Sequence, residues 1–282
     1  MKVNPQTLAI ERQIIPAADS TGKQLEAVYG IAVDDAAGTV WTGNTRTGSV
    51  AVYKQDDLSL VKQFKDAIAP HNRGVAVDSA RHRAYVAAHR KNYVNVFNTE
   101  TLEEKTRVEL ESPTRTKITP AALDFAIDQE AGKLFVVATT DQIYVIDEAS
   151  EKIEKVYDLK GAKGAIGIAY APEEKLLFVV SQSTDNLQIL DATDGKVKAD
   201  VKVGAGPLSV VWEPVKKLAY VANRASNSVA VVDLHGNLVA NLPGGSYTNH
   251  VFTDGKGTVY GVNKSRGATD QEGDQISRYV SR

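Results

Sequence analysis

The chain has 282 residues, of which 43% are hydrophobic and 24% charged, and its formal net charge is −2. This composition is typical of a globular protein with an apolar core, and a charge so close to zero predicts neither a nucleic-acid nor a membrane partner by itself. Cysteine is absent, which excludes disulfides, thiolate metal sites, thiol catalysis and covalent haem attachment.

The first residues have the pattern of β-strands. The start, MKVNPQTLAI, lacks the hydrophobic core of a signal peptide, and no apolar run in the chain approaches the ~20 residues of a membrane helix. Residues 1–14 instead match the end of one strand and the whole of a more polar one, as residues 96–110 do further along the chain. We expect residues 1–14 to contain the outer strand of a sheet.

One unit of sequence recurs six times along the rest of the chain. Each copy opens with an alternating run, such as GIAVD or GVAVD, that begins near residue 30, 74, 124, 167, 209 or 250. After a turn comes an aromatic-centred strand, and the aromatic residues lie 40 to 50 residues apart, at Trp41, Tyr85, Phe135, Phe178, Tyr220 and Tyr260. The period-two alternation and the turn chemistry predict β-strands, and no helical periodicity is present.

Every copy continues with a third strand such as SVAVVD, and five copies add a more polar fourth strand such as KVKADVKV. Four short strands in ~40–50 residues form the period of a β-propeller blade. The sequence therefore predicts an all-β propeller of four-stranded blades, in one domain over residues 1–282. Because the sixth copy stops after its third strand, residues 1–14 either complete that blade in a six-bladed propeller or belong to the first blade of a seven-bladed one.

Blade topology sorts the connections into two groups. We call "top loops" those that lead into each first strand or join second to third strands, and "bottom turns" those that join first to second or third to fourth strands. The top loops contain more bases than acids, whereas the bottom turns contain about twice as many acids as bases. We therefore expect the two ends of each blade to differ in charge.

The candidate ligand-binding residues are basic, histidine and tyrosine side chains assigned to the top loops: His71, Arg73, His89, Arg90, Lys91, Tyr93, Arg115, Lys117, Tyr247, His250, Lys264 and Arg266. Arginine and lysine neutralise phosphates while tyrosine stacks on bases, which is the combination that sequence-tolerant binding of single strands requires. Solvated charge on exposed loops would give the same pattern without any ligand. The aromatic residues within the strands, by contrast, are expected to lie in the core.

The stretch YVANRASNSVAVVD, Tyr220 to Asp233, carries a family signature. It resembles the YVTN-repeat family of β-propellers, whose repeat couples Y-V-T-N to S-N-T-V-S-V-I-D, with Ala222 in place of the threonine. The stretches VWTGNTRTGSVAVY, NPQTLAI and VNKSRGATDQEGDQISRY are similar to the bacterial periplasmic YncE-type members. That resemblance implies seven blades, an export signal upstream of this chain, binding of single-stranded DNA and no established enzymatic activity.

The loop charges predict a binding protein for an anionic ligand, and the resemblance implies that it is non-enzymatic, periplasmic or secreted, and that single-stranded DNA is the first candidate ligand. We expect a monomer, with an envelope protein as a candidate partner. We expect no catalytic residues, cofactor, metal site or membrane insertion. The alternatives are an enzyme similar to propeller lactonases or quinoprotein dehydrogenases, and an envelope scaffold for protein or glycan. No G-x-S-x-G, H-x-H or H-E-x-x-H motif favours an enzyme. We expect Asp147, Asp191 and Asp233, which end third strands in register, to cap turns rather than act in catalysis.

Overall fold

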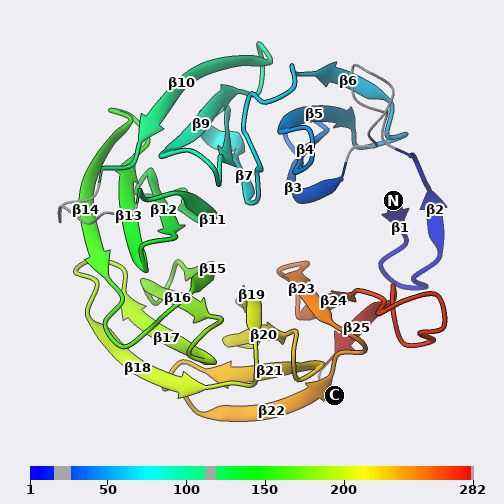
Figure 1. The fold of residues 1–282 in the computed structure, drawn as a ribbon, viewed down its shortest axis with the longest axis vertical. Helices are drawn as coiled ribbons and strands as arrows, with labels where there is room; N and C mark the ends of the chain where they lie inside the picture. The colour runs from blue at the N-terminus through cyan, green and yellow to red at the C-terminus, as the bar shows by residue number, and fades with distance from the viewer. Residues whose placement is uncertain (16–26, 112–118, 281–282) are drawn as a thin grey trace. The chain divides into compact units, whose positions relative to one another are not determined.

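The described part of the chain is almost entirely β-sheet (Figure 1). The computed structural model describes residues 1–15, 27–111 and 119–280. Within these ranges the only helical segment is η1 (Ser79–Arg81), a single 3₁₀ turn. No described segment forms a helix long and apolar enough to cross a bilayer.

The strands follow one another as blades, and in each blade the strands pair antiparallel in chain order. The first two blades comprise β3 (Val28–Asp34), β4 (Thr39–Asn44), β5 (Ser49–Lys54) and β6 (Leu60–Gln63), then β7 (Val75–Asp78), β8 (Arg83–Ala87), β9 (Tyr93–Asn98) and β10 (Glu103–Glu109). The next two comprise β11 (Ala122–Asp128), β12 (Lys133–Ala138), β13 (Gln142–Asp147) and β14 (Lys152–Asp158), then β15 (Ala165–Ala171), β16 (Leu176–Ser181), β17 (Asn186–Asp191) and β18 (Val197–Lys202). The last two comprise β19 (Pro207–Glu213), β20 (Leu218–Asn223), β21 (Ser228–Asp233) and β22 (Leu238–Pro243), then β23 (Thr248–Thr253), β24 (Thr258–Asn263) and β25 (Ile276–Val280).

The described residues therefore form the six blades of an all-β propeller, as the repeat predicts. The sixth sheet has three strands, in agreement with the repeat that stops after its third strand. At the N-terminus, β1 (Lys2–Val3) pairs with β2 (Ile10–Arg12) in a two-stranded sheet of its own. The pairing of the described strands thus does not include residues 1–14 as the fourth strand of the last blade, which is one of the two arrangements that the sequence leaves open.

The N-terminal hairpin repeats the turn that joins third and fourth strands in the blades. Asn4 Oδ1 accepts hydrogen bonds from the backbone N–H groups of Gln6 and Thr7. In the same way, Asn98 Oδ1 accepts from the N–H groups of Glu100 and Thr101. Leu8 has φ of 59°, close to the 53° of Leu102 at the same place in the second blade. Residues 1–14 thus contain the two short strands β1 and β2, and their place as the outer strand of a blade stays a prediction.

The chain divides into two compact units. Unit 1 contains Met1–Val136 and Val145–Glu154, and unit 2 contains Val137–Tyr144 and Lys155–Arg282. Unit 1 holds the N-terminal hairpin and the first two blades, and unit 2 holds the last three. The boundary falls within the third sheet, β11–β14. The single domain over residues 1–282 stays a prediction.

Aromatic side chains form the centre of each core. In unit 1 the rings of Trp41, Phe64 and Phe97 contact one another at centroid distances of 4.8 to 6.0 Å. In unit 2 Phe178 stacks on Trp212 at 5.1 Å. The strand aromatics expected in the core are buried: Trp41, Tyr85, Phe135, Phe178, Trp212 and Tyr220. Each such ring contributes ~2–3 kcal/mol through removal of apolar surface from water.

The aspartates that end third strands cap the following turns, as predicted. Asp233 Oδ1 accepts from the backbone N–H of His235 and Asn237 at 2.9 and 2.8 Å. Asp191 and Asp147 accept in the same way from the second or third residue after them. These bonds stabilise the charged carboxylate, and the bond from the Asn237 side chain is the largest cause that lowers the pKa of Asp233. The aspartates are therefore structural.

Candidate functional site

Two top loops of the second blade lie against each other. The backbone N–H of Arg90, in the loop between β8 and β9, donates to the carbonyl oxygen of Pro70 at 3.3 Å. The N–H of Arg73, in the loop before β7, donates to the carbonyl oxygen of Ala87 at 3.1 Å. These bonds bring together the stretches APHNRG and HRKN, which contain five of the candidate residues, His71, Arg73, His89, Arg90 and Lys91.

Asn72 fixes the first of these loops to the blade before it. The residue is fully buried, and its Nδ2 donates to the carbonyl oxygen of Ser49 at 2.9 Å. Its own carbonyl oxygen accepts from Thr45 Oγ1 at 2.9 Å. Because Asn72 is held on both sides, the residues next to it, His71 and Arg73, are held at fixed places on the loop surface. No sequence motif singles out Asn72.

His71 and His89 form a pair of imidazoles. Their ring centroids lie 5.5 Å apart with an interplanar angle of 37°, and both residues are half-buried. Desolvation lowers the pKa of both side chains below the usual value, and the neighbouring Arg73 and Arg90 lower it further. Nδ1 of His89 is buried and has no hydrogen-bond partner. Both rings are therefore biased towards the neutral form.

Arg73 stacks on a tyrosine of the first blade. Its guanidinium Cζ lies 5.2 Å from the ring centroid of Tyr29, and its Nη1 donates to Tyr29 Oη at 3.3 Å. Tyr29 is the second residue of β3 and is 50% exposed. A planar cation held on an aromatic face presents its remaining N–H donors in a fixed plane.

Tyr93 lies in a strand instead of the expected top loop. It is the first residue of β9, and Arg107 of the neighbouring β10 covers its ring at 4.7 Å. Arg107 is itself held by Glu104, at 2.6 Å from Nε and 3.2 Å from Nη2. The ring of Tyr93 is thus engaged inside its own sheet, because it starts the apolar run of the strand rather than ending the loop before it.

Unit 2 contains a second arginine–tyrosine site. Tyr247, in the loop that leads into β23, lies between two guanidinium groups, with Arg224 Cζ at 5.1 Å and Arg266 Cζ at 4.9 Å from its ring centroid. Asn227 Oδ1 accepts from the Tyr247 backbone N–H at 2.9 Å and from Arg266 Nη2 at 3.0 Å. The arrangement joins residues of the fifth and sixth blades. Arg224 contacts Tyr247 here, although it is not among the candidate residues predicted from the sequence.

The remaining candidates are distributed as follows. Lys264 comes directly after β24, and its side chain is exposed. His250 lies within β23 rather than in a loop. Its side chain is exposed to solvent. Arg115 and Lys117 lie outside the described residues.

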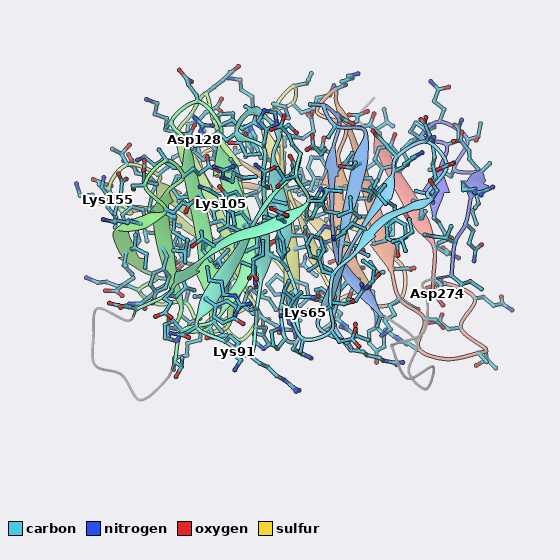
Figure 2. The ribbon with its side chains drawn as sticks, turned by 90° about the horizontal axis from the view of Figure 1, so that it is seen from above. Lys65, Lys91, Lys105, Asp128, Lys155 and Asp274 are labelled. Carbon is cyan, nitrogen blue, oxygen red and sulfur yellow. The ribbon has the colours of Figure 1, made fainter. Side chains whose placement is uncertain are left out.

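The top-loop bases that the structure describes form no ion pairs with carboxylates. Among the described residues there are ten of them: Arg46, Lys65, Arg73, Arg90, Lys91, Lys160, Lys163, Arg224, Lys264 and Arg266. The recorded ion pairs lie instead at the bottom turns and on the outer strands, for example those of Lys133 and Lys217. Within unit 1, Figure 2 shows Lys65 and Lys91 at one edge of the blades and Asp128 at the opposite edge.

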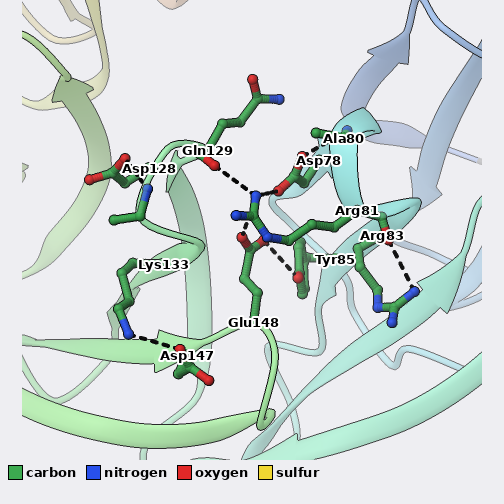
Figure 3. A network of polar contacts seen from close by, with 11 residues as sticks. Asp78, Ala80, Arg81, Arg83, Tyr85, Asp128, Gln129, Lys133, Asp147 and Glu148 are labelled. Carbon is green, nitrogen blue, oxygen red and sulfur yellow. Dashed lines mark hydrogen bonds and ion pairs between the residues drawn. The ribbon is translucent and has the colours of Figure 1, made fainter.

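A separate polar cluster lies at the bottom of the second and third blades in unit 1 (Figure 3). Tyr85 Oη donates to Oε1 of the buried Glu148 at 2.8 Å, and Arg81 Nη1 lies 3.6 Å from Glu148 Oε2. Arg81 also pairs with buried Asp78 at 2.8 Å and donates to the carbonyl oxygen of Gln129 at 2.7 Å. The pKa of Glu148 is raised to about 7, and desolvation is the largest cause. The hydrogen bond from Tyr85 opposes this shift.

That cluster joins two blades and has the features of a structural network. Every member contacts another member or a backbone carbonyl, and both carboxylates are buried. Within the described ranges, no group of three or more histidine, aspartate or glutamate side chains could hold a metal ion. The candidate sites are therefore the unpaired bases and tyrosines on the described top loops, taken for each unit separately.

Comparison with known proteins bears on the fold. No protein-family model matches the chain, and no curated protein matches it in sequence. Its structure is similar to a chain of the hydrazine synthase of Kuenenia stuttgartiensis, with a TM-score of 0.79 over 99% of this chain and 88% of that chain, at 16% sequence identity. Identity so low carries no activity from one protein to the other. The likeness to YVTN-repeat proteins thus stays a prediction, and the chain is, by its fold, a β-propeller protein.

Proposed function

We propose that this β-propeller is a binding protein that holds an anionic polymer on its top loops, and that the ligand is single-stranded DNA. The observation that carries the proposal is the set of top-loop bases without carboxylate partners. A cation already paired with a carboxylate must give up that partner before it can bind a phosphate. An unpaired cation on the surface has only water and counterions to release, which is the main source of affinity for nucleic acids.

The tyrosines favour a single strand over other anions. Tyr29 lies against Arg73, and Tyr247 lies between Arg224 and Arg266, so each tyrosine stands beside guanidinium groups. Bases in a single strand are free to stack on an aromatic or guanidinium plane, whereas those in a duplex are already stacked. The resemblance to YVTN-repeat proteins supports the same ligand. That resemblance, and no feature of the structure, also supports an exported monomer.

Fluorescence anisotropy with a labelled single-stranded oligonucleotide tests the proposal. At ~50 mM salt and micromolar protein we expect binding, because phosphate contacts are strongest at low ionic strength. The double variant Arg90→Glu with Lys91→Glu should bind at least ~10-fold more weakly, since it places two carboxylates beside the phosphates.

The matched control is Lys196→Glu with Lys217→Glu. It makes the same change in net charge in bottom turns, at lysines that already pair with Asp194 and Glu174. We expect its affinity to stay within about 3-fold of the original, apart from the long-range effect of charge. No binding by the unmodified protein, or equal loss in both double variants, would show that the top loops do not hold the ligand.

A further inference from the structure

The side chains His71, His89, Arg73 and Arg90 form a cluster of basic groups that, within the described ranges, has no carboxylate in ion-pair contact. The two imidazoles are 5.5 Å apart, and the residues that flank them in sequence supply the two guanidinium groups. No carboxylate lies within ion-pair distance of either arginine among the described residues. Protonation of the histidines would therefore add charge to a place that is already positive.

The backbone holds this cluster together in the free protein. His71 is in the left-handed conformation, with φ of 52°, which is uncommon for residues other than glycine. The bonds from Arg90 N–H to Pro70 and from Arg73 N–H to Ala87 keep the two loops in contact. The Tyr29 ring holds one side of the Arg73 guanidinium. Little reorganisation is thus needed before an anion can bind.

The charged groups that act on each histidine all belong to the cluster. Arg90 and Arg73 act on His71, and Arg73, His71 and Arg90 act on His89. The other charged groups of the adjoining loops and strand are Arg46, Lys65, Asp66, Lys91 and Asp124. Asp124 of β11 lies beside Gly74 and, like Asp66, already has a partner. Nothing in the described residues therefore supplies the negative charge that would stabilise the imidazolium forms.

We propose that His71, His89, Arg73 and Arg90 form a phosphate-binding subsite that takes up a proton from solvent when a phosphodiester of the DNA strand binds. The inference rests on the proposed function and adds a pH dependence to it. A phosphodiester stays singly negative across the range in which histidine titrates, so its charge favours the imidazolium form once bound. The proton comes from the buffer and adds to an imidazole nitrogen, and no covalent bond to the ligand forms.

The direction of the pH effect follows from linkage. Where binding takes up one proton, affinity rises by up to about tenfold for each unit that pH falls. Both free histidines are biased towards the neutral form, so this dependence lies on the acidic side of neutrality. The effect ends at lower pH, where the free histidines are already protonated.

Isothermal titration calorimetry with an oligothymidylate that lacks a terminal phosphate measures the proton directly. Thymine does not titrate between roughly pH 5.5 and 7.5, where histidine does, so any proton taken up belongs to the protein. Titrations in two buffers with different ionisation enthalpies give the number of protons. We expect about one proton taken up for each oligonucleotide bound, and tighter binding at pH ~6 than at pH ~7.5.

Variants locate the proton on this pair of histidines. His71→Gln with His89→Gln should still bind, through the arginines, but without proton uptake and with an affinity that no longer changes with pH. The matched control, His82→Gln with His235→Gln, removes the same number of histidines from the bottom turns and should keep the uptake. Circular dichroism establishes that each variant is folded, and the calorimetry of the unmodified protein needs no variant at all.

The outcomes separate this inference from the proposed function. Absence of oligonucleotide binding at low salt overturns both. Binding without proton uptake, or uptake that persists in His71→Gln with His89→Gln, overturns the proton-linked subsite and leaves the binding function in place. Uptake that is lost in the His82→Gln with His235→Gln control would assign the proton elsewhere and overturn it as well.

Discussion

Asn227 belongs to a set of three top-loop residues that each hold the following blade by one hydrogen bond. All three have a left-handed backbone, with φ between 53° and 55°. The acceptors Asp141, Asp185 and Asn227 take bonds from the backbone N–H of Ala165, Gly206 and Tyr247 at 2.7, 2.8 and 2.9 Å. Aspartate and asparagine tolerate this conformation better than most side chains. The two acids thus serve the fold, and they leave the top-loop bases unpaired.

Removal of this bond should destabilise the protein. Asn227→Ala leaves the Tyr247 N–H without its acceptor and places a poorly suited residue at φ of 54°, so we expect a loss of about 1–3 kcal/mol in the free energy of unfolding. Urea denaturation followed by tryptophan fluorescence measures it. Asn227→Asp introduces the residue that two other blades use and should stay within ~0.5 kcal/mol of the original. An unchanged midpoint for Asn227→Ala would show that the bond contributes nothing.

At the scale of elements, the bottom cluster around Glu148 joins the second and third blades. Tyr85 comes from β8, Arg81 from η1, and Glu148 follows β13, so three segments meet at one buried carboxylate. Asp78, also buried, adds a second negative charge. The surroundings therefore favour the protonated acid, and the hydrogen bond from Tyr85 and the charge of Arg81 only partly offset this.

This raised pKa predicts that stability falls as pH rises. The folded protein releases the Glu148 proton near pH 7, whereas the unfolded chain releases it near the ordinary value of 4.5. Between these values the folded state binds more protons, so the free energy of unfolding decreases with pH, by roughly 3 kcal/mol in total, and the loss is complete above pH 7. Urea denaturation at several pH values measures the slope.

Glu148→Gln should remove this part of the pH dependence, because glutamine keeps the shape without the titration. The exposed Glu130 lies in the bottom turn between β11 and β12, and Glu130→Gln controls for the loss of one negative charge. If the glutamine variant at position 148 kept the slope of the unmodified protein, the slope would have to come from another group.

The sequence predicted the elements well and their contacts less well. Strands such as β21 could be predicted because SVAVVD is apolar on both faces and a turn-forming aspartate ends it. The sequence also shows that a glycine recurs in the first strands, but it does not show why glycine is required there. At Gly30 a Cβ would overlap the carbonyl oxygen of Arg73, and at Gly167 it would lie 2.9 Å from that of Leu208. Such close approaches between neighbouring blades cannot be predicted from the sequence of a single repeat.

The candidate site was predicted in part for the same reason. Residues adjacent in sequence, such as those of HRKN, could be placed together on one loop. The position of Tyr93 could not be predicted in this way. A residue at the edge of an apolar run can be the first residue of a strand or the last residue of a loop, and the neighbouring residues are the same in both cases. Nor could the site around Tyr247 be foreseen, since Arg224 and Arg266 come from loops of two blades. Their distances depend on how the blades pack.

At the scale of the whole molecule, unpaired bases occur on the top loops of both units. Arg90 and Lys91 belong to unit 1, and Arg224 and Lys264 to unit 2. The net charge of −2 does not reveal these bases, because the acids of the bottom turns balance them. Those acids pair with bases or cap turns. The distribution of charge, rather than its sum, sets how a charged polymer would meet the surface.

The salt dependence of binding should therefore report on both units. For a single strand, each phosphate contact adds about 0.7 to the steepness of log affinity against log salt. Arg90→Gln with Lys91→Gln, and separately Arg224→Gln with Lys264→Gln, should each make the slope shallower by up to ~1.4. Lys196→Gln with Lys217→Gln serves as the paired-base control. A slope that none of the variants changes would exclude these side chains from phosphate contact.

The ion pairs of the bottom turns also affect how the protein can be handled chemically. Hydrogen bonds that Lys133, Lys196 and Lys217 donate to Asp147, Asp194 and Glu174 raise the pKa of these lysines, so at mildly alkaline pH the amines stay protonated and react slowly with acylating reagents. Lys91 and Lys264 have no such partner. Coupling to a sensor surface through amines would thus use lysines without such a partner, with Lys91 and Lys264 of the top loops among them.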